Sequence, residues 1–223
     1  MVRVCLLLAV VSLCSAFASE QTAGDLANGR GNTDNNVPVE SMGFDRTNYS
    51  PLKDINTSNV KRLAPVWNAS LMNDAGELAA PVVYNGVMYL INGRWTFAID
   101  VGTGRQIWRT AVEIDPGVQR VAPFGTIPRG APAIYNGKLF RVTLDNHLIA
   151  LDMKTGREVW NQTFADWREG YTATGAPIVA NHLHLQEPAV RDSRIRAWRQ
   201  LRATFCPAPG PDRWLGVDVR PDA

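Results

Sequence analysis

The chain has 223 residues, of which 45% are apolar and 20% are charged, and its formal net charge at pH 7 is +2. This balance is ordinary for a soluble globular protein. It excludes a strongly basic nucleic-acid-binding protein, because no excess of lysine and arginine is available to bind phosphates.

Residues 1–18 have the features of a secretory signal peptide. Arg3 precedes the apolar run "VCLLLAVVSLCSAFA", which ends in small residues at Ala16 and Ala18. The run is too short to span a bilayer comfortably. We therefore expect cleavage after residue 18, a periplasmic or secreted location, and no membrane span afterwards. A short membrane anchor and a lipoprotein attached through Cys14 are the alternatives.

Residues 19–43 form a leader segment between the signal peptide and the first regular elements. Cleavage would remove Cys5 and Cys14 and leave only Cys206. One thiol can build neither a disulfide framework nor a metal site. Core packing is therefore expected to hold the fold, even in an oxidising compartment.

The strongest signal is an internal repeat of about fifty residues. The motif "AIDVGTGRQIW" (Ala98 to Trp108) recurs as "ALDMKTGREVW" (Ala150 to Trp160). Upstream, "PVVYNGVMYLING" and "PAIYNGKLFRVTLDN" alternate apolar residues around an Asn-Gly pair, which predicts a tight hairpin. The pattern therefore predicts four antiparallel strands in each unit. Units of this length that end in tryptophan are typical of β-propeller blades.

The residues of the repeated motif have structural roles on this interpretation. The Asp carboxylate can accept hydrogen bonds from turn amides, and Gly104 and Gly156 can take positive φ. Trp108 and Trp160 are large and flat, which suits them to fill the space between neighbouring blades. None of these residues is expected to be catalytic.

Blade starts are visible at Ala80, Ala131 and Ala176, so the predicted fold is all-β, with about two complete propeller blades in residues 44–181. A propeller typically closes a ring of four to eight blades. The chain is therefore expected to be the beginning of a larger protein.

Residues 182–223 form a divergent tail with seven arginines, five prolines, no lysine and no hairpin signal. One explanation is a shifted reading frame. If the codons for residues 191–195 are read one nucleotide further on, they can encode Gly-Ile-Arg-Gly followed by Phe or Tyr. A naturally divergent tail is the alternative, and the nucleotide sequence decides between the two.

The segment "NYSPLKDINTSNVKRLAPVW" (Asn48 to Trp67), followed by the two Trp motifs, resembles the N-terminal part of PQQ-dependent (quinoprotein) alcohol dehydrogenases of the methanol and ethanol dehydrogenase type. The likeness covers about residues 41–181. It implies an eight-bladed propeller with pyrroloquinoline quinone (PQQ) and usually Ca²⁺ at its axis. It also implies oxidation of a small-molecule alcohol to an aldehyde: PQQ takes a hydride equivalent, an Asp accepts the hydroxyl proton, calcium polarises the quinone carbonyl, and the electrons pass to a cytochrome c.

The resemblance implies three cofactor-binding residues. Arg129 in "IPRGAPAIYNG" matches an arginine that reaches the PQQ carboxylates and quinone oxygens, a role that suits a forked and permanently charged guanidinium. Thr174 in "YTATGAP" matches a threonine that bonds the cofactor. Glu77 matches a glutamate shortly before the first Ala-Pro, although it lies one residue further from Pro81 than usual. Surface, strand and turn roles are the alternatives for these residues.

Two departures from the family pattern bear on function. Many members have adjacent cysteines over the cofactor, where this chain has Pro123 and Phe124, so that disulfide cannot form and Phe124 is a candidate apolar lid. The family's calcium ligands and catalytic Asp lie beyond residue 181, so neither a catalytic nor a metal-binding residue is assigned. The shifted frame of the tail would match a Gly-x-Arg-Gly-aromatic stretch of the family but would not restore a calcium-binding Glu.

The resulting hypothesis is a fragment of a periplasmic PQQ-dependent alcohol dehydrogenase that is inactive as written. No Cys-x-x-Cys-His haem motif occurs, so a cytochrome would be a separate partner or lie in a missing part. The rival hypothesis is a non-catalytic envelope β-propeller that serves as a binding scaffold, and a third is a defective gene product with no activity.

Overall fold

The computed structural model describes residues 36–43, 46–71, 79–121 and 130–180, together with the strand backbones of residues 183–186, 189–190, 199–200 and 203–205. The signal peptide expected at residues 1–18 and most of the leader lie outside these ranges, as do most residues of the tail. Within the described ranges, no helix has the length and apolar character that crossing a membrane requires.

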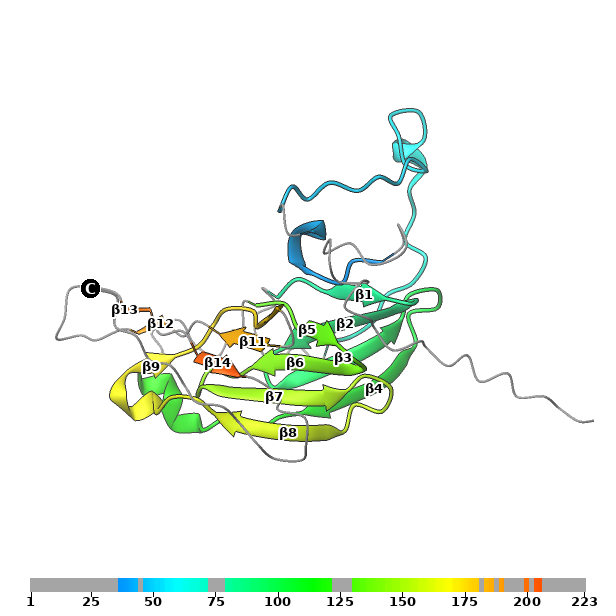
Figure 1. Ribbon diagram of the computed structural model, residues 1–223. Helices are drawn as coiled ribbons and strands as arrows, with labels where there is room; N and C mark the ends of the chain where they lie inside the picture. Colours follow the sequence, from blue (N-terminus) through cyan, green and yellow to red (C-terminus); the bar gives the residue numbers. More distant parts are fainter. Residues whose placement is uncertain are drawn as a thin grey trace, which may run out of the picture.

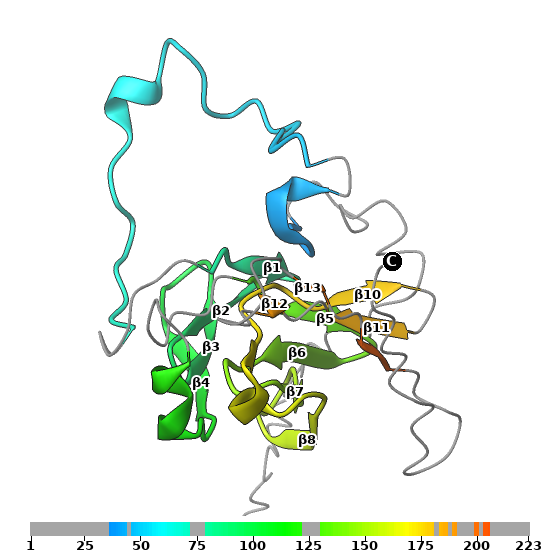
Figure 2. The same ribbon diagram turned by 90° about the vertical axis from the view of Figure 1, so that its left-hand side faces the viewer.

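Two four-stranded antiparallel sheets form the body of the protein (Figures 1 and 2). Blade 1 contains β1 (Val82–Tyr84), β2 (Val87–Asn92), β3 (Trp95–Asp100) and β4 (Gln106–Ala111). Blade 2 contains β5 (Ala133–Tyr135), β6 (Lys138–Val142), β7 (His147–Asp152) and β8 (Glu158–Thr163). In both sheets each strand pairs with the next strand in the chain, so the predicted all-β fold with two complete blades is confirmed.

Asn-Gly pairs make the first turn of each blade, as the sequence predicts. Asn85 and Gly86 have φ values of 49° and 75°, and Asn136 and Gly137 have values of 47° and 70°. Two successive positive φ values are what a tight hairpin with the right-handed twist of a sheet requires.

The Asp-x-x-Thr-Gly turn closes each blade through the Asp carboxylate. Asp152 Oδ1 accepts from the Thr155 amide and hydroxyl, both at 2.8 Å, and Asp100 binds Thr103 in the same way. The hydroxyl of Thr103 is the main cause that holds the pKa of Asp100 below its usual value. Burial acts to raise the pKa of Asp152, but the hydrogen bonds from Thr155 and its neighbour outweigh burial and lower this pKa as well.

These lowered pKa values predict a loss of stability in acid. A carboxyl group with a depressed folded pKa contributes stability above its unfolded pKa of about 3.9, and this contribution disappears as the pH falls through the folded value. We expect Asp152→Asn to lower the free energy of unfolding at pH 7 and to have much less effect near pH 2. Urea unfolding at both pH values measures the difference. Asp54→Asn, on an exposed loop, is the control, and an equal effect of Asp152→Asn at both pH values would contradict the prediction.

Trp108 and Trp160 occupy equivalent positions in the two blades, as the repeat predicts. Trp108 pairs with Ala98, and Trp160 pairs with Ala150. The ring of Trp108 lies on Gly156 of the next blade, where a Cβ would be 2.6 Å from the ring, and its Nε1 donates to Met153 O at 2.9 Å. The expected role of Trp108 between neighbouring blades is confirmed.

Apolar layers cover both faces of the blades in the described part of the chain, beside a small cluster around Val118 and Leu144. The middle layer joins blade 1 to blade 2 and contains Trp108, Leu139, Ile149 and Leu151 among its buried residues. The outer face of blade 2 carries a second layer around Phe140 and Leu148. The outer face of blade 1 carries a third layer around Phe97 and Ile99, against which residues 67–71 pack. Alternate residues of each strand therefore supply two different layers.

A third hairpin forms where the sequence lacks the Asn-Gly signal. β10 (Ile178–Ala180) pairs antiparallel with β11 (Leu183–Gln186). β14 (Ala203–Phe205) adds a third strand to this sheet. β9 (Tyr171–Thr172), β12 (Ala189–Val190) and β13 (Arg199–Gln200) make a further small sheet. The packing of β10 against β5 offers the physical reason, because it aligns β10 without help from the turn.

Short 3₁₀ turns make up the remaining regular structure among the described residues. They are η1 (Glu40–Met42), η2 (Val60–Arg62), η3 (Pro116–Arg120) and η4 (Trp167–Glu169). Val37 forms an antiparallel bridge with Val83, which ties the leader to the inner edge of blade 1. Residues 46–66 contain no strand and project from the sheets as an arm (Figures 1 and 2).

Candidate functional site

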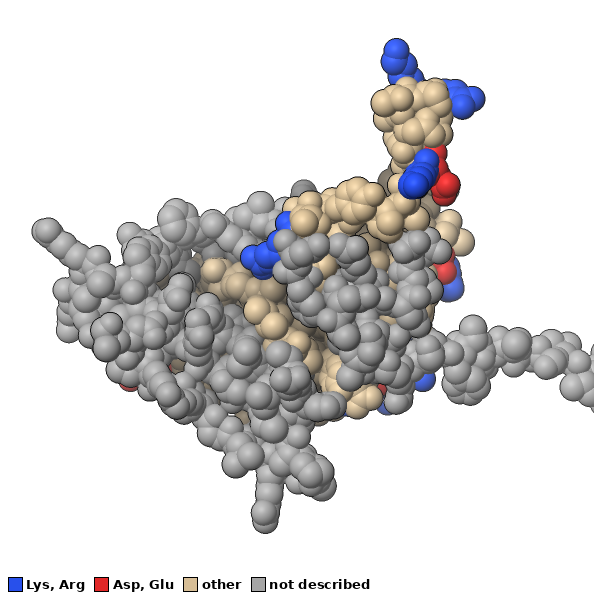
Figure 3. Space-filling view, turned by 45° about the horizontal axis from the view of Figure 1, so that its top comes forward, with Lys and Arg blue, Asp and Glu red and all other residues tan. Residues whose placement is uncertain are grey.

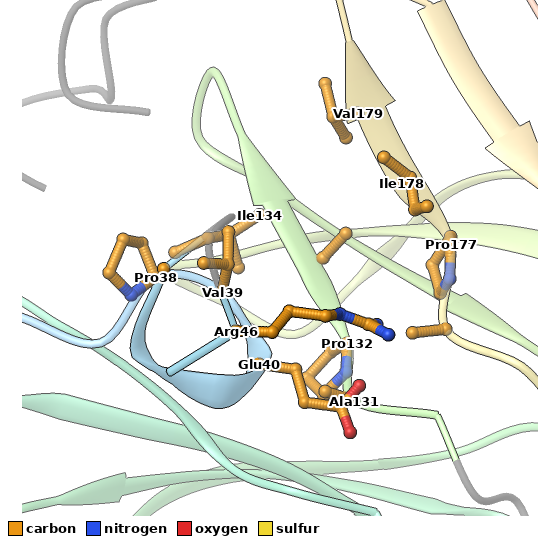
Figure 4. Close-up of a pocket in the computed structure, with 13 residues that line it drawn as sticks. Pro38, Val39, Glu40, Arg46, Ala131, Pro132, Ile134, Pro177, Ile178 and Val179 are labelled. Carbon is orange, nitrogen blue, oxygen red and sulfur yellow. The ribbon is translucent and has the colours of Figure 1, made fainter. Parts of the chain in front are cut away.

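A cavity of about 450 Å³ lies where the first strands of blade 2 and of the third sheet begin (Figure 4). Its walls are residues 131–134 at the start of β5, residues 176–179 at the start of β10, residues 38–40 and 43 of the leader, and Arg46 at the start of the arm. A concave site of this size can hold a small organic molecule.

The two Ala-Pro pairs of the repeat give the cavity its apolar walls. Ala131 and Pro132 precede β5, and Ala176 and Pro177 precede β10. Proline is tolerated at the first residues of a strand, where its missing N–H breaks no ladder bond. The repeat thus places small apolar groups at the same end of successive blades, and Ile134 extends this wall along β5 (Figure 4).

Gly130 brings the two strand starts into backbone contact beside the cavity. A Cβ at this position would collide with the Ala176 amide nitrogen and the Gly175 carbonyl carbon. Only glycine allows this approach. The segment that begins at Gly130 and the segment that begins at Gly175 are therefore locked side by side.

Glu40 and Arg46 are the charged residues among the described lining (Figure 4). Glu40 comes from the leader and Arg46 from the first residue of the arm, and the chain turns sharply between them: Ser41, Met42 and Arg46 have φ values of 64°, 60° and 52°. Positive φ values are uncommon for residues other than glycine, and they concentrate where a site constrains the backbone. The turn brings a carboxylate and a guanidinium to one largely apolar cavity, where the guanidinium can bind an acidic group of a small organic ligand.

Of the residues that the sequence predicts to bind or cover the cofactor, only Thr174 lies in the described part of the structure. Thr174 is half-buried and directly precedes Gly175, so it lies next to the contact with Gly130, although it is not part of the cavity lining. Arg129 and Glu77 lie outside the described residues, as do Pro123 and Phe124, so their roles stay predictions.

Sequence reasoning missed Glu40 and Arg46. Neither residue belongs to the repeat or to a recognisable motif, and both are remote in sequence from the strands that they meet. No local pattern could have placed the leader over the second blade. In the described ranges, no group of three or more His, Cys, Asp or Glu side chains is arranged to hold a metal ion.

Residues 41–124 match the family described as "Glucose/ethanol/alcohol dehydrogenase, beta-propeller domain", which is abbreviated PQQ. This match includes the whole of blade 1 and part of the leader.

Among similar curated proteins is "1-butanol dehydrogenase (quinone)" of Thauera butanivorans, which is 37% identical over 174 residues. That match covers 77% of this chain and 27% of the relative. Another is "1-butanol dehydrogenase (cytochrome c)" of the same organism, which is 38% identical over 136 residues, or 60% of this chain and 19% of the relative. The chain therefore spans about a quarter or less of the relatives that it matches.

Among solved structures, a "Europium-containing methanol dehydrogenase" superposes with a TM-score of 0.72 at 29% sequence identity. The superposition covers 78% of this chain and 30% of that protein. The two four-stranded sheets, the family match and the structural superposition therefore all indicate a β-propeller.

Proposed function

Because the chain belongs to the family of quinoprotein alcohol dehydrogenases, we propose that it supplies one side of the PQQ-binding site of such an enzyme. In this proposal the cofactor binds at the cavity between the starts of β5 and β10. The substrate is a small alcohol, and the product is the corresponding aldehyde.

The contact of Gly130 with Gly175 and Ala176 carries this proposal. Arg129 directly precedes the first partner of the contact, and Thr174 directly precedes the second. Consecutive Cα atoms are about 3.8 Å apart. Thr174 is therefore one residue away from this backbone contact, and Arg129 is the residue that precedes Gly130 in the sequence, which supports the cofactor role that the family resemblance implies for both.

The described lining fits the organic cofactor. PQQ is a flat quinone with several carboxylates, so it needs apolar walls and cationic donors. Ala131, Pro132 and Ile134 supply such a wall, and the Arg46 guanidinium supplies a donor that can bind two carboxylate oxygens at once. When bound, PQQ would accept the hydride equivalent that leaves the alcohol.

The described lining does not fit a calcium ion. Calcium takes six to eight oxygen ligands, typically several of them carboxylates. Among the described residues of the cavity, Glu40 is the one carboxylate. A calcium site would thus depend on residues outside the described part of the chain.

We place the protein in the periplasm or outside the cell, on the basis of the signal peptide expected at residues 1–18. The electron acceptor in this proposal is a cytochrome c, either a separate partner or a part of the protein outside this sequence. One relative is named for cytochrome c, which supports this partner.

The 223-residue chain by itself is expected to be inactive. In the described part of the chain, two complete blades and two smaller sheets fall short of the four to eight blades that close a propeller ring. Open sheet edges favour association over a stable monomer. The purified chain, assayed with PQQ, Ca²⁺, an artificial electron acceptor and several primary alcohols, should show no alcohol-dependent turnover above the cofactor background. Turnover above that background would contradict this expectation.

A chimera tests the cofactor site itself. Residues 41–180 would replace the corresponding part of 1-butanol dehydrogenase (quinone), so that a complete ring is present. We expect Arg129→Ala to weaken PQQ binding about tenfold or more, because a charge-assisted hydrogen bond contributes about 1.5–3 kcal/mol. Arg120→Ala, at the exposed end of η3, is the matched control. Equal PQQ affinity of both variants would refute the role of Arg129, and a chimera without a quinone spectrum would favour the scaffold hypothesis.

A further inference from the structure

Residues 36–43 of the leader, which we call the strap, are attached to blade 1 at the edge of β1. Val37 N–H donates to Val83 O at 2.8 Å, and Val83 N–H donates to Val37 O at 2.9 Å. The Asn85 amide also donates to Asn36 Oδ1 at 2.9 Å. A pair of residues that exchanges two such bonds makes one rung of an antiparallel ladder. The beginning of the strap is therefore fixed to a rigid sheet.

This attachment is short in comparison with the ladders inside the blade. Val37 and Val83 form an isolated bridge in the described structure, whereas β2 and β3 pair continuously over residues 87–92 and 95–100. Segments that are held by few hydrogen bonds open locally at a lower free energy than the core strands of a sheet. The strap can therefore detach from β1 while blade 1 stays folded.

Beyond the bridge, the strap becomes a wall of the cavity. Pro38, Val39, Glu40 and Gly43 line it together with the first residues of β5 and β10. Figure 4 shows the Glu40 side chain extending toward Ala131 at the start of β5. The strap thus connects blade 1 to a cavity whose other walls belong mainly to blade 2 and the third hairpin.

The far end of the strap has an unfavourable backbone conformation. Ser41 and Met42 have φ values of 64° and 60°, which residues with a side chain rarely adopt. Such conformations concentrate at ligand clamps and switch segments. The arm that follows projects from the body of the protein (Figure 3). Residues 41–43 can therefore act as a hinge, because a few residues at the end of an element are enough to absorb a change of backbone angles.

We propose that the strap opens and closes the cavity, and that the Val37–Val83 bridge breaks each time a ligand enters or leaves. The identity of the ligand rests on the proposed function, in which PQQ binds here, whereas the opening itself does not. In the closed position, Pro38 and Val39 cover one side of the ligand with apolar groups. Closure of this kind keeps water away from a bound molecule and slows its release.

A disulfide across the bridge tests the proposal. Val37→Cys combined with Val83→Cys joins a pair that exchanges both hydrogen bonds. The Cα atoms of such a pair are about 5.5 Å apart, which a disulfide can span. The matched control is Val83→Cys with Met88→Cys, which joins two neighbouring strands of blade 1 and leaves the strap free. Both pairs would be introduced into the chimera described above, extended to begin at residue 36.

We expect the oxidised Val37–Val83 variant to release PQQ at least about tenfold more slowly than the same protein after reduction and removal of the reductant, because local opening is then blocked. The equilibrium affinity for PQQ should change by less than about twofold, since the closed form is the one that binds. The control pair should release PQQ at the same rate in both redox states. Equal release from the oxidised and reduced Val37–Val83 variant would overturn the proposal.

Hydrogen exchange in the absence of any ligand separates this inference from the proposed function. In the chimera without engineered cysteines, the amides of Val37 and Val83 should exchange at least about tenfold faster than the ladder amides of β2 and β3. The oxidised Val37–Val83 disulfide should remove this difference. Exchange at Val37 as slow as in the ladders would overturn the strap. A chimera that shows the fast exchange but binds no PQQ would support the strap and overturn the proposed function.

Discussion

Trp108→Ala should lower the free energy of unfolding by about 3–5 kcal/mol, the usual cost of removing a large buried aromatic side chain. Trp108 is only 8% exposed, packs against Tyr89 and Gly156, and donates a buried hydrogen bond to Met153 O. Its removal would separate the two complete blades along their shared layer. Urea unfolding followed by a short protease pulse, at protein concentrations low enough to prevent association, measures the loss.

Two further variants separate the ring of Trp108 from its hydrogen bond. Trp108→Phe keeps most of the ring and loses the Nε1 donor, so the expected cost is about 1–2 kcal/mol. Gly156→Ala adds a methyl group under the ring, at a position with φ of 72°. Its cost should fall when Trp108→Ala is also present, to the left-handed backbone strain of about 1–2 kcal/mol and the remaining contact with Thr110 Oγ1, which would lie 2.8 Å from the added Cβ. Simple additivity of these two changes would show that the ring and the glycine are not in contact.

Arg141→Ala should lower the free energy of unfolding by about 3–5 kcal/mol, as expected when one member of a buried charged network is removed. Arg141 is fully buried between the blades. Its guanidinium donates to Thr96 Oγ1 and Gly93 O, both at 2.9 Å, and to Arg94 O at 3.2 Å. Burial lowers the pKa of Arg141 to about 9, and the Asp145 carboxylate opposes this shift. The side chain is thus charged at neutral pH and depends on these hydrogen bonds.

Arg141→Lys and Arg157→Ala are the comparisons for this prediction. A lysine keeps the charge but cannot reach the same acceptors with a planar fork, so we expect a loss of about 1–3 kcal/mol. Arg157 is exposed in the turn before β8, and its replacement should change stability by less than about 0.5 kcal/mol. If Arg141→Ala lowered the free energy of unfolding no more than Arg157→Ala does, the hydrogen bonds of Arg141 would not stabilise the packing of the two blades.

Local sequence determined the two complete blades and their turns. The Asn-Gly pairs supply the two successive positive φ values that a tight hairpin requires. The Asp carboxylate of the Asp-x-x-Thr-Gly motif accepts hydrogen bonds from amides of the same turn, and apolar residues alternate along the strands with a period of two. Each of these features acts within a few residues, so it is visible in the sequence without the fold. The repeat also placed Trp108 and Trp160 at equivalent positions, because copies of one motif fold to the same local structure.

The candidate site was only partly visible in the sequence. The position of Thr174 next to Gly130 depends on a backbone contact between two blades, and the Gly-Ala-Pro pattern gives only a hint of it. Glu40 and Arg46 line the cavity because the leader and the start of the arm lie beside the first residues of β5 and β10, and β10 pairs with β11 although the sequence between them lacks glycine. These features rest on contacts between segments far apart in the chain, whose alignment no local pattern records.

The sequence by itself thus determined what one blade is, and the tertiary structure decided how blades and segments meet. Trp67 illustrates the difference. In the sequence it ends an irregular segment without a hairpin or an Asp-x-x-Thr-Gly motif, so no strand was predicted there. In the structure it rests on Gly104 as Trp108 rests on Gly156. The position of Trp67 is defined by the sheet face that it covers, and the residues of that face lie far from it in the sequence.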